Sequence, residues 1–310
     1  MAVPADAVTD VQYFYSDFDY EEHRRRVLAG ESEAQASAVN AAAVTCCDAD
    51  ARWADSTHQA AAWSRFYGCH DSTPFFKARR YLTAEFPALR RSGITVLEVG
   101  CGTGASVVPL LRQNHGARVI ACDFSASAVA ACAKAVADAG IQPSRFCCFQ
   151  ADPGACDEPQ QFAEAVRSAA AAAGWTDFDE VDAATAIFVL SALVPSREAA
   201  FIAAVAAAVR PGGVLCVRDY GVGDMTHLRF PSTSRRSPDA LLFQRGDATL
   251  ARFYDKDALV SRVIHSAGAA GVKLTADDNH WCCVSVKNRA EQLDMRRVFV
   301  HAQFTRPTCD

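Results

Sequence analysis

A regular alternation of two kinds of segment, between residues 94 and 220, constrains the fold more than any other feature. Apolar runs with strand-forming residues take turns with Ala-rich runs of helical length. Parallel strands joined by helices produce this alternation, because each strand is buried on both faces. We therefore predict a mostly parallel α/β sheet with helices on both faces. The expected strands are 94–99, 118–123, 145–150, 181–190 and 213–220.

Signals at helix ends agree with this order of elements. Ser125 precedes the Ala-rich run to Ala139 and is an N-cap candidate, because its hydroxyl can accept from a free N–H group of the first turn. The Pro-Gly-Gly sequence at 211–213 is expected to close a helix over 196–210 and to lead into the fifth strand.

The remaining segments add to one main domain. Residues 1–60 lack strand-like alternation, which predicts a helical or partly ordered arm before a domain over 61–310. A segment over about 221–252, dense in Arg, Ser, Pro and Phe, interrupts the pattern just past the fifth strand. An insertion there could form a wall of the substrate site, and a surface loop without function is the alternative. A helix at about 255–267 and strands near 281–287 and 296–304 are expected to follow.

Charge sets a limit on nucleic-acid partners. The formal net charge of −5 gives no overall basic signal, so such a partner has to be held by local clusters of Arg. A short run of Arg is more often a solvated face, unless several runs converge in space. The candidates are Arg24–Arg26, Arg79–Arg80, Arg235–Arg236 and Arg296–Arg297.

The 13 cysteines are expected to be reduced thiols. The N-terminus lacks the basic segment followed by an apolar one that marks a secretory leader. Adjacent cysteines at 46–47, 147–148 and 282–283 lack the CxxC spacing of zinc sites, so we expect small buried residues and no metal. No run approaches the roughly 18 apolar residues of a membrane span. No membrane partner is expected, and the expected location is cytoplasmic, with the nucleus also open.

The segment EVGCGTG carries the first functional signal. Glu98 ends the first expected strand, and Gly100, Gly102 and Gly104 fill the turn into the next helix, where glycine permits positive φ and close approach to a ligand. By spacing alone the segment also fits the dinucleotide fingerprint. Asp123 ends the second strand about 20 residues later, where a carboxylate can accept from both ribose hydroxyls. Together they indicate a nucleoside-binding site.

Two features favour S-adenosylmethionine over NAD: the acidic residue before the glycines, and the lack of a second nucleotide-binding half. After the third strand, Asp152 can present an acceptor to the adenine amino group, although an Asp in this position is often only a turn residue. Trp63 and Tyr67 lie one helical turn apart, so a helix would place them on one face. They are expected either to cover the cofactor, with an aromatic face toward its sulfonium, or to pack in the core.

Segments spread over roughly residues 60–307 share a more specific pattern. They are WSRFY, FFKARRYL, EFPAL, VLEVGCGTG, ACDFS, IFVLSAL, VRPGGVLCVRDYG, DMTHLRF, RGDAT and NRAEQLDMRRVFVHAQF. Together they resemble the tRNA 3-methylcytidine methyltransferases of the methyltransferase-like group. The VRDYG, LRF, RGD-x-T and NRxxQLxM elements lie outside the generic cofactor fold and are the most specific. The chain departs from the family at Ala78, Pro153, Ala248 and Leu250, where Asp, Leu, Gly and Arg are usual.

This resemblance implies a class I S-adenosylmethionine-dependent methyltransferase of the Rossmann-like fold. It implies tRNA as substrate and, for some members, an aminoacyl-tRNA synthetase such as seryl-tRNA synthetase as a partner. The implied cofactor contacts are Trp63, Tyr67, Gly100, Asp123, Asp152 and Ile187, to which the glycine turn adds Glu98, Gly102 and Gly104. The expected contacts to substrate RNA are Phe76, Lys77, Arg79, Arg229, Arg245 and Arg289.

The residues after the fourth and fifth strands fit a ring nitrogen as the methylated atom. IFVLSAL contains no Asp/Asn-Pro-Pro-Tyr-like motif for an exocyclic amine and no Pro-Cys pair for attack on carbon 5. A ring nitrogen has its own lone pair, so the enzyme mainly has to flip the base, align it and exclude water. Arg218, Asp219 and Tyr220 are the candidate catalytic residues, either as hydrogen-bond partners of the base or as acceptors of the proton that the product sheds.

The expected target is nitrogen 3 of a cytidine at the start of a tRNA anticodon loop. Two alternatives come from other classes of function, because a fold does not fix a substrate. One is a methyltransferase that acts on a small molecule or a protein. The other is a silent module that only binds RNA or a synthetase, and the intact Gly100, Asp123 and Asp152 argue against it.

Overall fold

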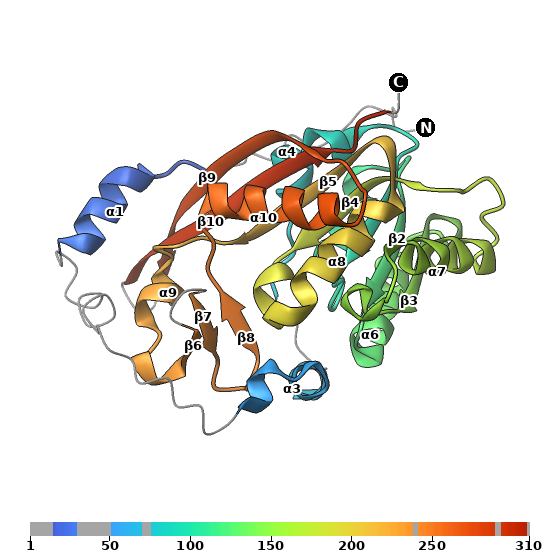
Figure 1. Ribbon diagram of the computed structural model, residues 1–310. Coiled ribbons are helices and arrows are strands. Elements are labelled where there is room, and N and C mark those ends of the chain that lie inside the picture. The colour runs from blue at the N-terminus through green and yellow to red at the C-terminus, as the bar shows by residue number, and fades with distance from the viewer. Residues whose placement is uncertain (1–14, 30–50, 70–75, 238–240, 289–292, 309–310) are drawn as a thin grey trace.

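A seven-stranded sheet forms the centre of the computed structural model, which describes residues 15–29, 51–69, 76–237, 241–288 and 293–308. The strand order is β3-β2-β1-β4-β5-β10-β9, and helices cover both faces (Figure 1). The first five strands pair in parallel, whereas β10 is antiparallel to β5 and β9. The strands are β1 Thr95–Val99, β2 Arg118–Asp123, β3 Phe146–Gln150, β4 Val181–Ile187, β5 Val209–Tyr220, β9 Thr275–Asn288 and β10 Leu293–Thr305.

This architecture confirms the predicted α/β sheet, with the main differences in the bounds of four strands. β4 stops at Ile187 because the chain turns into a short 3-10 helix over Leu190–Ala192. The helix before β5 ends at Ala208, so the Pro-Gly-Gly sequence lies inside the strand rather than before it. Gly212 has a φ of 74°, which bends the strand, and its N–H donates to the carbonyl of Arg306. The two late strands are longer than expected.

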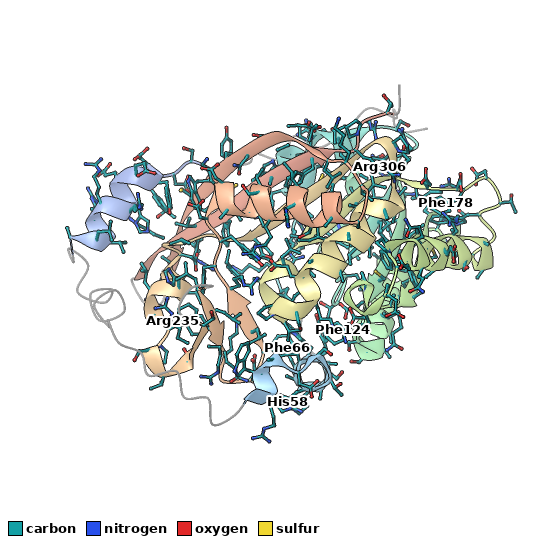
Figure 2. The ribbon with its side chains drawn as sticks, viewed as in Figure 1. His58, Phe66, Phe124, Phe178, Arg235 and Arg306 are labelled. Carbon is teal, nitrogen blue, oxygen red and sulfur yellow. The ribbon has the colours of Figure 1, made fainter. Side chains whose placement is uncertain are left out.

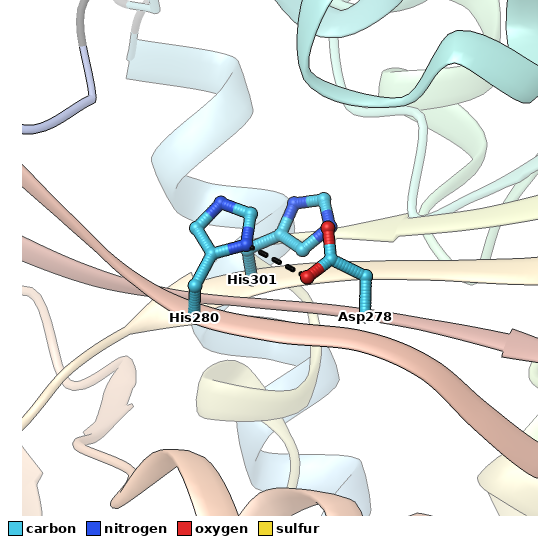
Figure 3. Close-up of side chains that lie close together, drawn as sticks. All are labelled: Asp278, His280 and His301. Carbon is cyan, nitrogen blue, oxygen red and sulfur yellow. Dashed lines mark hydrogen bonds and ion pairs between the residues drawn. The ribbon is translucent and has the colours of Figure 1, made fainter.

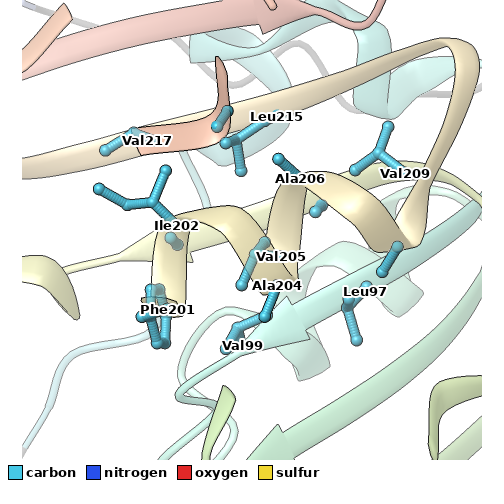
Figure 4. Close-up of a cluster of buried hydrophobic side chains, with 14 of the residues drawn as sticks. Leu97, Val99, Phe201, Ile202, Ala204, Val205, Ala206, Val209, Leu215 and Val217 are labelled. Atoms are coloured by element: carbon cyan, nitrogen blue, oxygen red, sulfur yellow. The ribbon is translucent and has the colours of Figure 1, made fainter. Parts of the chain in front are cut away.

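Two apolar layers hold the helices to the sheet. On one face α7, α8 and α10 pack against residues such as Leu97, Val99 and Leu215 (Figure 4). On the other face α4, α5 and α6 cover Val96, Val119 and their neighbours. Ser125 caps α6 as predicted, because its hydroxyl accepts from the Ala128 N–H. The helices are α4 Leu82–Glu85, α5 Val107–Gln113, α6 Ala126–Asp138, α7 Pro159–Ala172, α8 Pro195–Ala208 and α10 Lys256–Ala269.

The insertion after β5 folds into a small unit of its own. It contains α9 Met225–Arg229 and a three-stranded antiparallel sheet of β6 Arg235–Ser237, β7 Leu242–Gln244 and β8 Leu250–Arg252. Leu242 and Leu250 pack against Val194 and Trp53, which joins the unit to the loop before α8 and to the chain just before α3. The insertion therefore stands over the carboxyl edge of the parallel strands.

Two N-terminal helices pack at separate places (Figure 1). α1 Tyr20–Leu28 lies against β9, where Tyr20 stacks on Trp281 with ring centroids 3.8 Å apart. α3 Ser56–Cys69 lies beside the insertion, and the Gln59 amide donates to the carbonyl of Ala248 at 3.1 Å. The described part of the predicted arm contains α1 and the beginning of α3, and before α1 Ser16 forms a β-bridge with Cys283. Residues 1–14 and 30–50 lie outside the described residues.

Candidate functional site

A two-part cavity lies at the carboxyl edge of the parallel strands, between α3 and the insertion. One part, the aspartate part, is lined by Asp123 and Asp152 at the ends of β2 and β3. The other part, the arginine part, reaches the insertion and β10. Phe66 and Phe124 lie at this edge of the molecule (Figure 2). The two parts share the lining residues Trp63, Tyr67, Gly100, Phe188 and Ala192.

Asp123 is held in place by backbone groups. Its Oδ2 accepts from the Gly102 N–H and its Oδ1 from the Ser125 N–H, both at 3.0 Å. Burial raises the pKa of this carboxyl to about 6. The carboxylate is ionised at neutral pH, and each oxygen keeps a further lone pair for a ligand hydroxyl. This arrangement suits the two hydroxyls of a ribose.

The glycine turn leaves space that other residues would fill. Gly100 has a φ of 69°, and a Cβ there would lie 2.5 Å from Cγ2 of Val189. Gly102 has a φ of 51°, and a Cβ there would approach the Tyr67 hydroxyl to 3.1 Å. The turn therefore needs glycine for its backbone conformation and for the room above it.

Asp152 serves as a local cap. Its Oδ1 accepts from the Gly154 N–H at 3.0 Å and caps the short helix Pro153–Ala155. The turn role weighed from the sequence is thus present. The side chain also lines the aspartate part, so its other oxygen remains a candidate acceptor for an adenine amino group.

Trp63 and Tyr67 occupy one face of α3, and both line the two parts of the cavity. Their ring centroids are 5.8 Å apart. The Trp63 Nε1–H is buried and has no hydrogen-bond partner within the described part of the chain. A buried donor without a partner is costly, so a ligand acceptor in the cavity would relieve it. The donor set, the acidic acceptors and the glycine turn together fit an adenosyl group.

Three cations from distant segments converge on the arginine part. Arg79 follows α3, Arg245 lies in the insertion and Arg297 lies on β10. The Arg79 guanidinium is 5.1 Å from the Phe188 ring centre, and that of Arg245 is 5.8 Å from the ring of Tyr220. Phe188 and Tyr220 are partly exposed, and positive charge beside accessible aromatic faces is typical of sites that bind phosphates and unstacked bases.

Phe188 stands where the two parts meet. It follows β4 with a φ of 61°, a region that residues with large side chains rarely adopt. Its N–H donates to the carbonyl of Arg218 at 2.7 Å, and its ring lies 5.0 Å from that of Tyr220. Packing and hydrogen bonding hold the strained backbone in place, as is frequent at functional sites.

The three candidate catalytic residues occupy different environments. Tyr220 lines the arginine part. Arg218 is buried, pairs with Glu85 and lies 4.7 Å over the ring of Tyr81. Asp219 is fully buried, accepts from the Ser191 N–H at 2.9 Å, and burial raises its pKa to about 6. Neither Arg218 nor Asp219 is among the lining residues. Direct contact of these two residues with the substrate stays a prediction, and their placement does not support it.

Two residues of the glycine segment act beneath the turn. Glu98 is fully buried and accepts from the hydroxyl of Thr185. Burial raises the pKa of Glu98. Gly104 has a φ of 84° and lies against Cys132 of α6, where a Cβ would be 3.3 Å from the sulfur. Both support the turn from below, and their predicted contact with the cofactor stays a prediction.

The predicted RNA contacts divide in the same way. Phe76, Arg79 and Arg245 line the arginine part, and so do Gly102 and Ile187 of the predicted cofactor set. Lys77 and Arg229 are exposed and are not among the lining residues. Arg289 lies outside the described residues. Arg297, from the candidate cluster Arg296–Arg297, also lines the arginine part. Lining residues that were not singled out from the sequence include Phe188, Ser191, Thr226, Asp247 and Thr249.

Comparisons with known proteins agree with this geometry. A family model described as a methyltransferase domain matches residues 97–215. The tRNA N(3)-cytidine methyltransferase METTL6 of Rattus norvegicus is 31% identical over 255 residues, which cover 80% of this chain and 79% of that protein. The tRNA N(3)-methylcytidine methyltransferase trm141 of Schizosaccharomyces pombe is 31% identical, with 77% and 89% covered. The chain belongs to the tRNA N(3)-cytidine methyltransferase family.

Coverage differs among members of this tRNA N(3)-cytidine methyltransferase family. The METTL2 protein of Mus musculus is 33% identical over 72% of this chain, and the match spans only 51% of that protein's length. Among solved structures, an S-adenosylmethionine-dependent methyltransferase from Anabaena variabilis is 12% identical with a TM-score of 0.56, and 80% and 94% of the two chains are covered. That similarity shows the fold. The methyltransferase domain and the family identify S-adenosylmethionine as the cofactor.

One departure from the family pattern has a structural signature. Ala248, where the family usually has Gly, has a φ of 70°. Left-handed backbone conformation costs roughly 1 kcal/mol at a residue with a Cβ. The Arg245 N–H donates to the Thr249 carbonyl at 2.8 Å, and the Ala248 N–H to the Arg245 carbonyl at 2.9 Å, which closes the turn. The turn keeps its conformation although the residue that favours it is missing.

The described cysteines and helices can be compared with the expectations of reduced thiols and of no membrane span. Cys147 and Cys148 are half-buried free thiols, and Cys282 and Cys283 are buried free thiols. The pair at 46–47 lies outside the described residues. Among the described residues, no helix has both the length and the apolar character that crossing a membrane requires.

Proposed function

We propose that this chain transfers a methyl group from S-adenosylmethionine to nitrogen 3 of a cytidine in a tRNA anticodon loop. The observation that carries the proposal is the two-part cavity, in which acidic acceptors for a nucleoside lie next to a cationic, aromatic chamber. Bound S-adenosylmethionine supplies an electrophilic methyl group. The chain's own residues bind the two substrates, align them and exclude water.

In the aspartate part, the ionised Asp123 accepts hydrogen bonds from the ribose hydroxyls of the cofactor. Asp152 accepts from the adenine amino group through its free oxygen, and the glycine turn lets the backbone approach. Trp63 covers the junction from α3 and donates its indole N–H to the ligand. Each contact to a charged acceptor contributes about 1.5–3 kcal/mol.

In the arginine part, a flipped cytosine ring enters beside aromatic side chains. Phe188 and Tyr220 offer faces for stacking, and Arg79, Arg245 and Arg297 meet the phosphates that flank the base. A loop cytidine costs little to splay out, and its Watson–Crick edge is free. Nitrogen 3 attacks with its own lone pair, so alignment is the main contribution. Tyr220 is the proposed hydrogen-bond partner of the base edge.

Labelled methyl transfer followed by mass spectrometry of the nucleosides tests this function. The purified chain is incubated with tRNA that lacks 3-methylcytidine, with and without seryl-tRNA synthetase, which we propose as a presenting partner. We expect label in 3-methylcytidine, loss of label with Asp123→Ala, and no change with Asp138→Ala, whose exposed side chain pairs with Lys134 at the surface of α6. Label on carbon 5, on a ribose or on protein, or none in any arm, would contradict the proposal.

A further inference from the structure

Three side chains gather at the antiparallel edge of the sheet (Figure 3). Asp278 and His280 lie on β9, and His301 lies opposite His280 on β10. The alternation of side chains along a strand places all three on one face. One potential ligand atom from each residue lies within 4.8 Å of the other two. None of the three is among the lining residues of the cavity, so the cluster is separate from the proposed methyl-transfer site.

The Asp278 carboxylate presents one oxygen to each imidazole. Its Oδ1 lies 3.1 Å from Nδ1 of His280, and its Oδ2 lies 3.5 Å from Nε2 of His301. The two imidazole rings stack with centroids 4.2 Å apart. Two imidazole nitrogens and a carboxylate thus lie close together.

A buried carboxylate fixes the orientation of His301 from behind. Nδ1 of His301 lies 3.1 Å from Oε1 of Glu85, and both side chains are buried. Glu85 is itself held by the Arg218 guanidinium. A carboxylate on one imidazole nitrogen leaves the other as the ligand atom, which is the arrangement behind histidines that bind metals. Phe86 stacks on the same ring at 4.3 Å and limits its rotation.

The open side of His301 faces the Asp278 carboxylate. With its Nδ1–H donated to Glu85, the Nε2 lone pair faces Oδ2 of Asp278, and two acceptors then oppose each other at 3.5 Å. A cation at that point, or a second proton on the ring, removes the conflict. A proton would bridge only His301 and Asp278, whereas a metal ion could bind all three ligand atoms, which lie close together.

We propose that Asp278, His280 and His301 bind a divalent transition-metal ion of the zinc type, with Glu85 as the positioning residue behind His301. Two imidazoles and one carboxylate suit zinc better than magnesium or calcium, which prefer oxygen ligands. The site revises the expectation of no metal, which rested on cysteine spacing.

Binding needs a small movement of the two outer ligands. Zinc bonds to nitrogen and oxygen are about 2.0–2.2 Å long, so the ligand atoms have to approach one another. His280 must also turn, because stacked rings direct their lone pairs along parallel lines. The side chains of His280 and Asp278 are 30% and 55% exposed, which leaves them free to move, whereas His301 stays fixed. Water fills the fourth position of the ion.

Calorimetric titration of the chelator-treated full chain with zinc chloride tests the site. We expect one strong equivalent per chain, and at least a tenfold weaker affinity in Asp278→Ala and His280→Ala. His265→Ala is the matched control, since His265 is exposed on α10, and it should bind zinc as the unaltered chain does. The altered side chains are partly exposed, so circular dichroism should show folded protein, and zinc should raise the unfolding temperature of the control but not of these variants.

Cobalt as a spectroscopic substitute separates this site from the free thiols. Nitrogen and oxygen ligands give cobalt d–d bands without the intense thiolate charge-transfer band. A thiolate band, or equal zinc affinity and stoichiometry in Asp278→Ala and His280→Ala, would assign the metal to cysteines and overturn the proposal. Failure of the unaltered chain to bind zinc would overturn it as well. Neither result depends on methyl transfer.

Discussion

Strands β1 to β4 end at one common edge of the sheet, whereas β9 and β10 run antiparallel and meet along their whole length. At the common edge, each strand places a cavity-lining residue at its carboxyl end, such as Asp123 at the end of β2 and Phe188 after β4. At the antiparallel edge, residues become neighbours through cross-strand pairing, as His280 and His301 do. The first arrangement builds a cavity, and the second builds a cluster of ionisable side chains that runs from the buried Glu85 and His301 to the partly exposed Asp278 and His280.

The ion pair between Arg218 and Glu85 gives the largest expected effect. Arg218→Ala leaves the buried Glu85 carboxylate without its guanidinium, so we expect the free energy of unfolding to fall by about 3–5 kcal/mol in chemical denaturation. Arg26→Ala, which removes a half-exposed pair with Glu22, should change it by less than about 1 kcal/mol. If methyl transfer is lost while stability is unchanged, Arg218 acts in catalysis and the comparison fails.

Asp123→Ala should abolish the binding of S-adenosylmethionine at calorimetric concentrations. Two hydrogen bonds to a charged acceptor are lost, which corresponds to roughly a 100-fold or greater loss of affinity. The fold should persist, because the side chain faces the cavity. Unchanged affinity would show that the ends of the parallel strands do not hold the cofactor.

The pH dependence of stability tests whether burial raises the pKa of Asp123. Burial raises the pKa of Asp123 from 3.8 to about 6, so the folded chain binds more protons than the unfolded chain between these values. Stability from this group is therefore present below about pH 4 and is lost as pH rises through about 6. Asp123→Asn removes the titration, and the stability of the variant relative to the unaltered chain should rise by on the order of 2 kcal/mol between pH 4 and pH 8.

Denaturation of both proteins without cofactor across this range measures the difference. Asp219, whose pKa is also raised to about 6 by burial, titrates in both proteins and cancels in the comparison. A difference that is independent of pH would show that Asp123 stays ionised throughout.

Arg245 and Arg229 test whether the cavity or the surface holds the RNA. Arg245 lines the arginine part, whereas Arg229 is exposed outside it. We expect Arg245→Ala to lower the slope of log affinity against log salt by about one unit, since one phosphate contact is lost. Arg229→Ala should leave the slope unchanged. The measurement is tRNA binding over a series of salt concentrations. A lower slope with Arg229→Ala and an unchanged slope with Arg245→Ala would indicate that the RNA binds to the outer surface of the insertion.

Ala248→Gly gives the smallest expected effect. Glycine removes the cost of the left-handed backbone at this turn, so we expect a gain of about 0.5–1 kcal/mol in the free energy of unfolding. The same change at Ala139, whose φ is −76° at the end of α6, should bring no gain. A loss at position 248 would show that the Ala248 methyl group contributes packing that outweighs the strain.

Sequence patterns predicted the parallel part well for a physical reason. Local periodicity fixes each strand, and the carboxyl ends of parallel strands meet without further information, so Asp123 and Asp152 could be placed together. Long-range pairing decides the rest. Arg297 enters the cavity because β10 pairs with β5, and Arg218 turns into the core to meet Glu85, neither of which any short motif encodes. For the cluster of Asp278, His280 and His301, the D-x-H spacing at 278–280 is a signal that the sequence offers.

The backbone of Phe188 carries a consequence for how this enzyme can be altered. Any side chain at this position has to accept a φ of 61°, so glycine would relax the chain, and β-branched residues would be resisted most strongly. A large ring at this position costs backbone strain, and it places an aromatic wall between the two proposed ligands. Gly at this position would relieve a backbone cost of about 1 kcal/mol, but it would also remove the packing of the ring against Tyr220 and Phe299. The two proposed substrates would then lose the wall that separates and aligns them.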